Sequence, residues 1–137
     1  QVHLDRGLTL TDATDAWSLI IEDEAQIREN LMRFLRLEGH DVAFAADGVA
    51  GLALLRSAPP ELVICDFMMP RMDGFAVLAE LQADEALRRL PFIMLSASAE
   101  PERLAMAVAM GARAYVTKPF RFAEIRELLH RHLPGTG

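Results

Sequence analysis

The sequence has one cysteine, one tryptophan and one tyrosine among its 137 residues, and it has no long apolar segment. A single cysteine, Cys65, excludes an internal disulfide, and its apolar surroundings predict a small buried side chain in a reducing compartment. The longest run without a charged residue covers only the ten residues 90–99, which is too short to span a bilayer. The first sixteen residues lack the basic and apolar regions of a signal peptide. These absences predict a cytoplasmic protein that does not enter a membrane.

Basic residues are also scarce. The chain has 14 lysines and arginines against 20 acidic residues, which gives a net charge of −6. An acidic chain without a basic stripe repels nucleic acid, so we expect no direct nucleic-acid binding by this chain. The apolar share of 52% and the charged share of 25% are typical of a globular protein, and the length fits one domain.

The pattern divides the chain into three parts. Residues 1–16 are rich in Thr and Asp without a sustained helical or strand period, and they are interpreted as a flexible tail or a remnant of how the chain was prepared. Residues 17–133 form the predicted domain, and residues 134–137 a short C-terminal tail. A start at Gln1 suggests a trimmed chain or a piece of a longer protein.

From residue 17 onward a strand, a loop and a helix alternate five times. The expected strands are 17–21, 41–44, 62–65, 91–95 and 114–117. The expected helices are 24–38, from 47 to the Pro59–Pro60 pair, 74–83, from 100 to Gly111, and 121–132. Short, continuously apolar strands are covered on both faces, as in a parallel sheet between helices. We therefore predict an α/β fold: a doubly wound, flavodoxin-like sheet of five parallel strands flanked by five helices. A (β/α)₈ barrel would need about 250 residues.

Polar residues follow four of these strands at their carboxyl ends, where an open parallel sheet has its ligand crevice. Glu22 and Asp23 follow the first strand, and Asp66 follows the third. Ser96 follows the fourth strand and Lys118 the fifth. The topology therefore predicts that three carboxylates, a hydroxyl and an ammonium converge at one edge.

These groups suit the chemistry of phosphoryl transfer. Three clustered carboxylates repel one another unless a cation neutralises them, and hard oxygen ligands with open positions suit Mg²⁺. Lys118 and Ser96 suit the oxygens of a phosphoryl group. A carboxylate such as Asp66 can act as the nucleophile and form an aspartyl phosphate.

Four segments together carry a family resemblance: LIIEDE, VICDFMMPRMDGF, MLSAS and AYVTKPF. In this order and at these distances, residues 17–133 resemble the receiver domains of bacterial two-component response regulators, the CheY-like superfamily. The resemblance implies a phosphorylatable switch that catalyses only its own phosphorylation and dephosphorylation and is not an enzyme with an external substrate. It leaves open a stand-alone regulator, part of a hybrid kinase and part of a longer regulator.

The resemblance assigns roles to the acidic residues. Asp66 would accept a phosphoryl group from a phosphohistidine of a sensor histidine kinase or of a histidine phosphotransfer protein. Asp23, Asp66 and the backbone carbonyl of Met68 would bind Mg²⁺ directly. Glu22, where the family more often has Asp, would act on the metal mainly through water.

The resemblance also implies how the switch works. Lys118 would pair with the carboxylate or the phosphate, and its bond to Pro119 would be cis. Ser96 would move to the phosphoryl oxygen and Tyr115 would follow it inward. This motion would reshape the face made by the fourth helix, the fifth strand and the fifth helix, where a downstream effector or a second copy of the chain would bind.

Two other interpretations remain open at this point. A phosphohydrolase of the haloacid dehalogenase type would need a second Asp two residues after the nucleophile, where this chain has Met68. A degenerate receiver would have lost part of the acidic set, which is intact here. The resemblance also implies that Met68 and Ser98 flank the path of the attacking water, and our hypothesis is that the bulky Met68 slows its attack.

Overall fold

The computed structural model describes residues 2–3, 9–10 and 17–133 of the chain. Its main sheet has five parallel strands in the order β4-β3-β5-β6-β7. The strands are β3 (Ser18–Ile21), β4 (Val42–Ala45), β5 (Leu62–Asp66), β6 (Phe92–Ser96) and β7 (Ala114–Thr117). The helices are α1 (Ala25–Leu37), α2 (Gly48–Ser57), α3 (Gly74–Gln82), α4 (Pro101–Ala109) and α5 (Phe122–His132). The predicted five-stranded, doubly wound α/β fold is confirmed.

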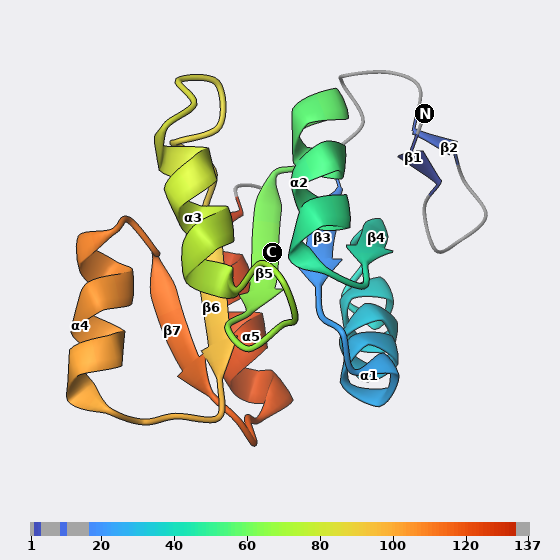
Figure 1. Ribbon diagram of the computed structural model, residues 1–137. Helices are drawn as coiled ribbons and strands as arrows, with labels where there is room; N and C mark the ends of the chain where they lie inside the picture. The colour runs from blue at the N-terminus through green and yellow to red at the C-terminus, as the bar shows by residue number, and fades with distance from the viewer. Residues whose placement is uncertain (1, 4–8, 11–16, 134–137) are drawn as a thin grey trace.

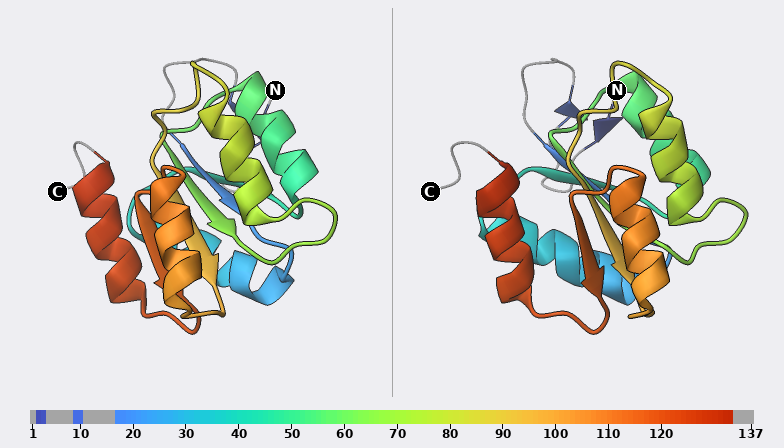
Figure 2. Two further views of the ribbon diagram at one scale, coloured as in Figure 1. Left: turned by 60° about the vertical axis from the view of Figure 1, so that its left-hand side comes forward. Right: turned by 90° about the vertical axis from the view of Figure 1, so that its left-hand side faces the viewer.

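Helices cover both faces of the sheet, and each face has its own apolar core (Figures 1 and 2). On one face, α1 and α5 pack through residues such as Leu31, Leu35 and Ile125. On the other face, α2, α3 and α4 pack against the sheet, with Leu55 and Leu78 among the buried residues. This double cover explains why the strands are apolar throughout instead of alternating.

The elements begin and end close to where the sequence predicts. Asp47 and Asp73 cap α2 and α3 by accepting hydrogen bonds from backbone N–H groups, at 2.7 Å and 2.8 Å. Gly39 and Gly111 follow α1 and α4 with φ of 90° and 109°, a conformation that favours glycine. The expected strand 62–65 is one residue longer, because Asp66 still pairs with Leu95 of β6. The expected strand 41–44 lies one residue later, at Val42–Ala45.

Part of the chain before the domain is also described. Val2–His3 (β1) pairs with Thr9–Leu10 (β2) in a short antiparallel ladder. The rest of residues 1–16 and the tail 134–137 lie outside the described residues, so their interpretation as tails stays a prediction. In the part of the chain that is described, every helix is too short or too polar to cross a membrane.

Candidate functional site at the carboxyl edge of the sheet

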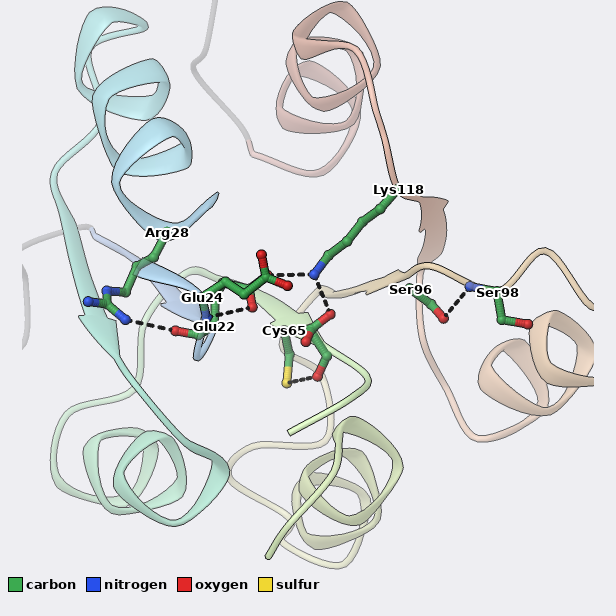
Figure 3. Close-up of polar contacts among 8 residues, drawn as sticks. Glu22, Glu24, Arg28, Cys65, Ser96, Ser98 and Lys118 are labelled. Atoms are coloured by element: carbon green, nitrogen blue, oxygen red, sulfur yellow. Dashed lines mark hydrogen bonds and ion pairs between the residues drawn. The ribbon is translucent and has the colours of Figure 1, made fainter. Parts of the chain in front are cut away.

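The carboxyl edge of the sheet brings together the residues that the topology predicts there. Glu22, Asp23 and Asp66 each offer an oxygen, and these oxygens lie within 4.8 Å of one another. The Lys118 ammonium lies 2.8 Å from Glu22 Oε1 and 2.7 Å from Asp66 Oδ1 (Figure 3). Ser96 is the last residue of β6, the neighbour of β5. One ammonium thus bridges carboxylates that are far apart in the sequence.

The three carboxylates lie in different environments. Glu22 is fully buried and Asp66 is 4% exposed, whereas Asp23 is exposed. Both Glu22 oxygens have protein donors: Lys118 on Oε1, and the N–H of Glu24 on Oε2 at 3.2 Å. The Glu22 carboxylate is therefore held by the protein, and Asp23 and Asp66 keep more free lone pairs for a ligand.

Burial dominates the electrostatics of this cluster. Burial raises the pKa of Glu22 to about 7, with a further increase from the Asp66 charge and a partial offset from the Lys118 hydrogen bond. Burial also raises the pKa of Asp66, and again Lys118 opposes the shift. Burial acts to lower the pKa of Lys118, but hydrogen bonds with Asp66 and Glu22 outweigh it, so this pKa is raised. The cluster has more buried negative charge than one ammonium neutralises.

This donor set fits a divalent cation. Carboxylate oxygens from three residues, one of them open to solvent, are hard ligands of the kind that Mg²⁺ prefers. A cation there would oppose burial and the smaller repulsion between carboxylates, which together raise the pKa of Glu22 and Asp66. Met68, whose backbone carbonyl is the remaining predicted ligand, lines a cleft together with Asp23 and Asp66, and this residue is 69% exposed.

The loop after β6 links the two predicted switch residues. The backbone N–H of Ser98 donates to Ser96 Oγ at 3.1 Å, and the Tyr115 hydroxyl donates to the carbonyl oxygen of Ser98 at 2.7 Å. Ser96 is buried and Tyr115 is half-buried. A movement of Ser96 would therefore act on the same loop residue that Tyr115 binds. The Lys118–Pro119 bond is cis, as the resemblance implies.

The site opens into a cleft of about 450 Å³. Its lining includes most of the predicted residues and four that were not predicted as site residues: Glu24, Phe67, Ala97 and Arg103, which lies in the first turn of α4. Glu22 lies behind the cleft and Tyr115 outside its lining. A signal for Arg103 was available: a helix that follows a strand of a parallel sheet begins at the carboxyl edge. The lining residues are Asp23, Glu24, Asp66, Phe67, Met68, Ser96, Ala97, Ser98, Arg103 and Lys118.

Comparison with known proteins agrees with this geometry. The family model of the response regulator receiver domain matches residues 18–130, which includes the whole main sheet. The chain belongs to this family. Its members act in two-component signalling, and the resemblance stated from the sequence is confirmed.

Two curated relatives are named as regulators of transcription. The probable transcriptional regulator ycf27 of Porphyridium aerugineum is 38% identical over 131 residues, covering 87% of this chain and 53% of the relative. The DNA-binding dual master transcriptional regulator RpaA of Synechocystis sp. is 37% identical, over 82% of this chain and 48% of the relative. The chain thus spans about half the length of the curated relatives it matches.

This chain covers almost the whole length of the similar chains whose structures have been solved. The chemotaxis response regulator CheY4 of Vibrio cholerae superposes with a TM-score of 0.81 at 31% identity, over 88% of this chain and 100% of that one. The receiver domain of the sensor histidine kinase PA1611 of Pseudomonas aeruginosa superposes with a TM-score of 0.79 at 28% identity, over 87% and 98%. That structure has a magnesium ion coordinated in its active site cleft. The shared region is the receiver fold itself.

Proposed function

We propose that this receiver domain is a Mg²⁺-dependent phosphorylation switch in which Asp66 accepts a phosphoryl group. The observation that carries the proposal is the Lys118 ammonium within 2.8 Å of both Glu22 and Asp66, beside three clustered carboxylates. A buried nucleophile, an adjacent cation and a metal-ligand set are the parts that phosphoryl transfer to a carboxylate requires. The phosphorus donor would be a phosphohistidine of a sensor histidine kinase or of a histidine phosphotransfer protein.

In the transfer, Asp66 Oδ attacks the phosphorus atom in line with the leaving group. A new oxygen–phosphorus bond forms, the bond between phosphorus and the donor breaks, and the leaving group keeps the electron pair. Asp66 must be ionised to attack, and its hydrogen bond with Lys118 favours that form against burial. Asp23, Asp66 and the Met68 carbonyl would hold a Mg²⁺ ion directly, and Glu22 would act on it through water. The bound ion would supply positive charge to the phosphoryl oxygens.

The switch would follow from the loop after β6. Ser96 is placed at the end of the neighbouring strand, and its side chain would move to donate a hydrogen bond to a phosphoryl oxygen on Asp66. Such a movement would disturb the hydrogen bond from the Ser98 N–H to Ser96 Oγ and, through the Ser98 carbonyl, the contact with Tyr115. The surface of α4, β7 and α5 would change, and with it binding of an effector or of a second copy.

Phosphorylation is tested by incubating the chain with Mg²⁺ and acetyl phosphate and measuring its intact mass. We expect the gain of one phosphoryl group in the wild type and none in Asp66→Asn. Asp73→Asn is a matched control, because Asn caps a helix as well as Asp does. No gain in the wild type would support a degenerate receiver, and a gain that persists in Asp66→Asn would place the phosphate elsewhere. Repeated hydrolysis of an ordinary phosphomonoester, which is not an acyl phosphate, would support a hydrolase.

The lifetime of the phosphoryl group tests the role of Met68. Its exposed side chain borders the cleft, so we expect Met68→Asn to increase the rate of autodephosphorylation about fivefold by removing bulk and adding a polar group for water. Met106→Asn is the control, since Met106 is 50% exposed on α4 outside the cleft lining. A slower or unchanged rate in Met68→Asn would contradict the hypothesis.

A further inference from the structure

Arg103 places a second cation in the lining of the cleft. It is half-buried, and its guanidinium carbon lies 4.4 Å from the ring centroid of Phe67, the residue next to Asp66. The Phe67 ring meets Phe75 of α3 edge-on at 5.0 Å. The Phe67 N–H donates to the carbonyl of Leu95 at 2.7 Å. The guanidinium therefore rests on a ring whose position is fixed by two neighbouring elements.

The two cationic side chains that line the cleft have different partners. Lys118 already bridges Glu22 and Asp66, at 2.8 Å and 2.7 Å. Arg103 makes no ion pair with a carboxylate anywhere in the described part of the chain, and its contact is with an aromatic face. A guanidinium held over an aromatic ring uses none of its N–H donors in that contact, so they are available to another partner.

The charge of the cleft explains what that partner would be. Asp23, Glu24 and Asp66 line it, and the buried Glu22 lies behind them, so an incoming phosphate dianion meets mainly negative groups. A planar guanidinium in the lining offsets this repulsion and can bind two oxygens of a phosphate or carboxylate at once.

We propose that Arg103 is an anion-recognition residue of the phosphorylation site, which draws small acyl phosphates into the cleft and binds their oxygens before transfer to Asp66. The proposal rests on the function proposed above and adds a residue that selects donors by their charge. With acetyl phosphate, the Asp66 oxygen–phosphorus bond forms, the phosphorus–acyl oxygen bond breaks, and acetate leaves with the electron pair. The total charge of −3 on the reacting groups is conserved, because a carboxylate and a dianion become a phosphorylated Asp66 and acetate.

The test compares two small donors of different charge by intact mass, in the same Mg²⁺ buffer at low ionic strength. We expect Arg103→Gln to lower the rate per donor concentration about fivefold with acetyl phosphate, a dianion, because one stabilising charge is lost. With phosphoramidate, whose nitrogen makes it less negative at neutral pH, the decrease should be under about twofold. Added salt should slow the wild type with acetyl phosphate more than it slows the variant.

Two further variants keep the result interpretable. Arg88→Gln removes the same charge from an exposed residue outside the cleft lining, and it should leave both rates unchanged. Arg103→Lys retains the charge without the planar fork, and it should give an intermediate rate with acetyl phosphate. Thermal melts of each variant would confirm that it is folded.

Some outcomes would overturn the proposal. If Arg103→Gln slows both donors equally, Arg103 acts by positioning Phe67 and not by recognising charge. If neither rate changes, it has no part in donor binding. If the wild type takes up no phosphoryl group from either donor, the proposed function itself fails, which is a different result from a normal wild type with an unaffected variant.

Discussion

The interior of the central strand β5 and its last residue are almost equally buried, yet they differ in what burial does. Leu62 to Cys65 are fully buried and apolar, so removal from water stabilises them. Asp66 is 4% exposed, and burial there raises its pKa because the charged form is poorly solvated. The same sheet therefore gains stability in its interior and loses some of it at its carboxyl edge, where the chemistry lies.

The largest expected effect is in the interior. Ile64→Ala removes a fully buried side chain between the sheet and α1 and α5, and it should lower the free energy of unfolding by about 4 kcal/mol. Chemical denaturation measures this loss. Leu104→Ala is the control, because Leu104 is 43% exposed on α4, and its change should stay under about 1 kcal/mol. A loss of under 1 kcal/mol for Ile64→Ala would show that the interior is not the source of stability.

Removal of the bridging cation comes next. Lys118→Met keeps the aliphatic stem but leaves Glu22 and Asp66 facing each other without the ammonium. Without Mg²⁺ at pH 8, we expect a loss of about 3 kcal/mol, since an unpaired buried charge is costly. At pH 5 the loss should be much smaller because the carboxylates take up protons. An equal loss at both pH values would mean that Lys118 contributes packing only.

Glu22 itself should make the wild type less stable as pH rises. Its pKa is about 7 in the folded chain against 4.5 for an ordinary glutamate, so between these values the folded state binds more protons than the unfolded state. Stability from this group is complete below 4.5 and is lost as the pH rises to about 7. In EDTA, Glu22→Gln should remove on the order of 1 kcal/mol of this pH dependence. Urea unfolding at pH 5 and pH 8 gives the free energy of unfolding at each pH. The same change between the two pH values in the wild type and in Glu22→Gln would contradict the prediction.

The smallest expected effect comes from His40, which lies away from the carboxyl edge of the sheet. Its contribution to stability changes with pH in the opposite direction to that of Glu22. Burial lowers the pKa of His40 from its ordinary 6.5, with Glu38 opposing the shift and His130 adding to it. Below pH 6.5 the unfolded chain binds more protons, so stability from His40 is present above 6.5 and is lost as pH falls through the folded pKa. His40→Asn should reduce this acid-side loss by under about 1 kcal/mol, measured between pH 7 and pH 5. A steeper loss in the variant would rule out this role for His40.

Much of the site was predictable because it follows from strand order. In a parallel sheet the residues after each strand meet at one edge, so Asp66, Ser96 and Lys118 were placed there from their positions alone. Helix caps were predictable for a similar reason, since Asp73 needs only its own local backbone. The place of Arg103 near this edge follows from the start of α4 and could have been predicted, but its contact with Phe67 could not, because it depends on how α4 lies against the loop after β5.

The sequence by itself determined the five parallel strands and the family. It also determined which polar residues follow the strands and form the site. These features follow from local pattern and from the direction of the strands, which do not require side-chain positions. Only the tertiary structure decided that Glu22 is fully buried while its neighbour Asp23 is exposed, and that Lys118 lies between two carboxylates. The physical reason is that burial and charge balance depend on every element packed around a group, and those elements come from distant parts of the chain.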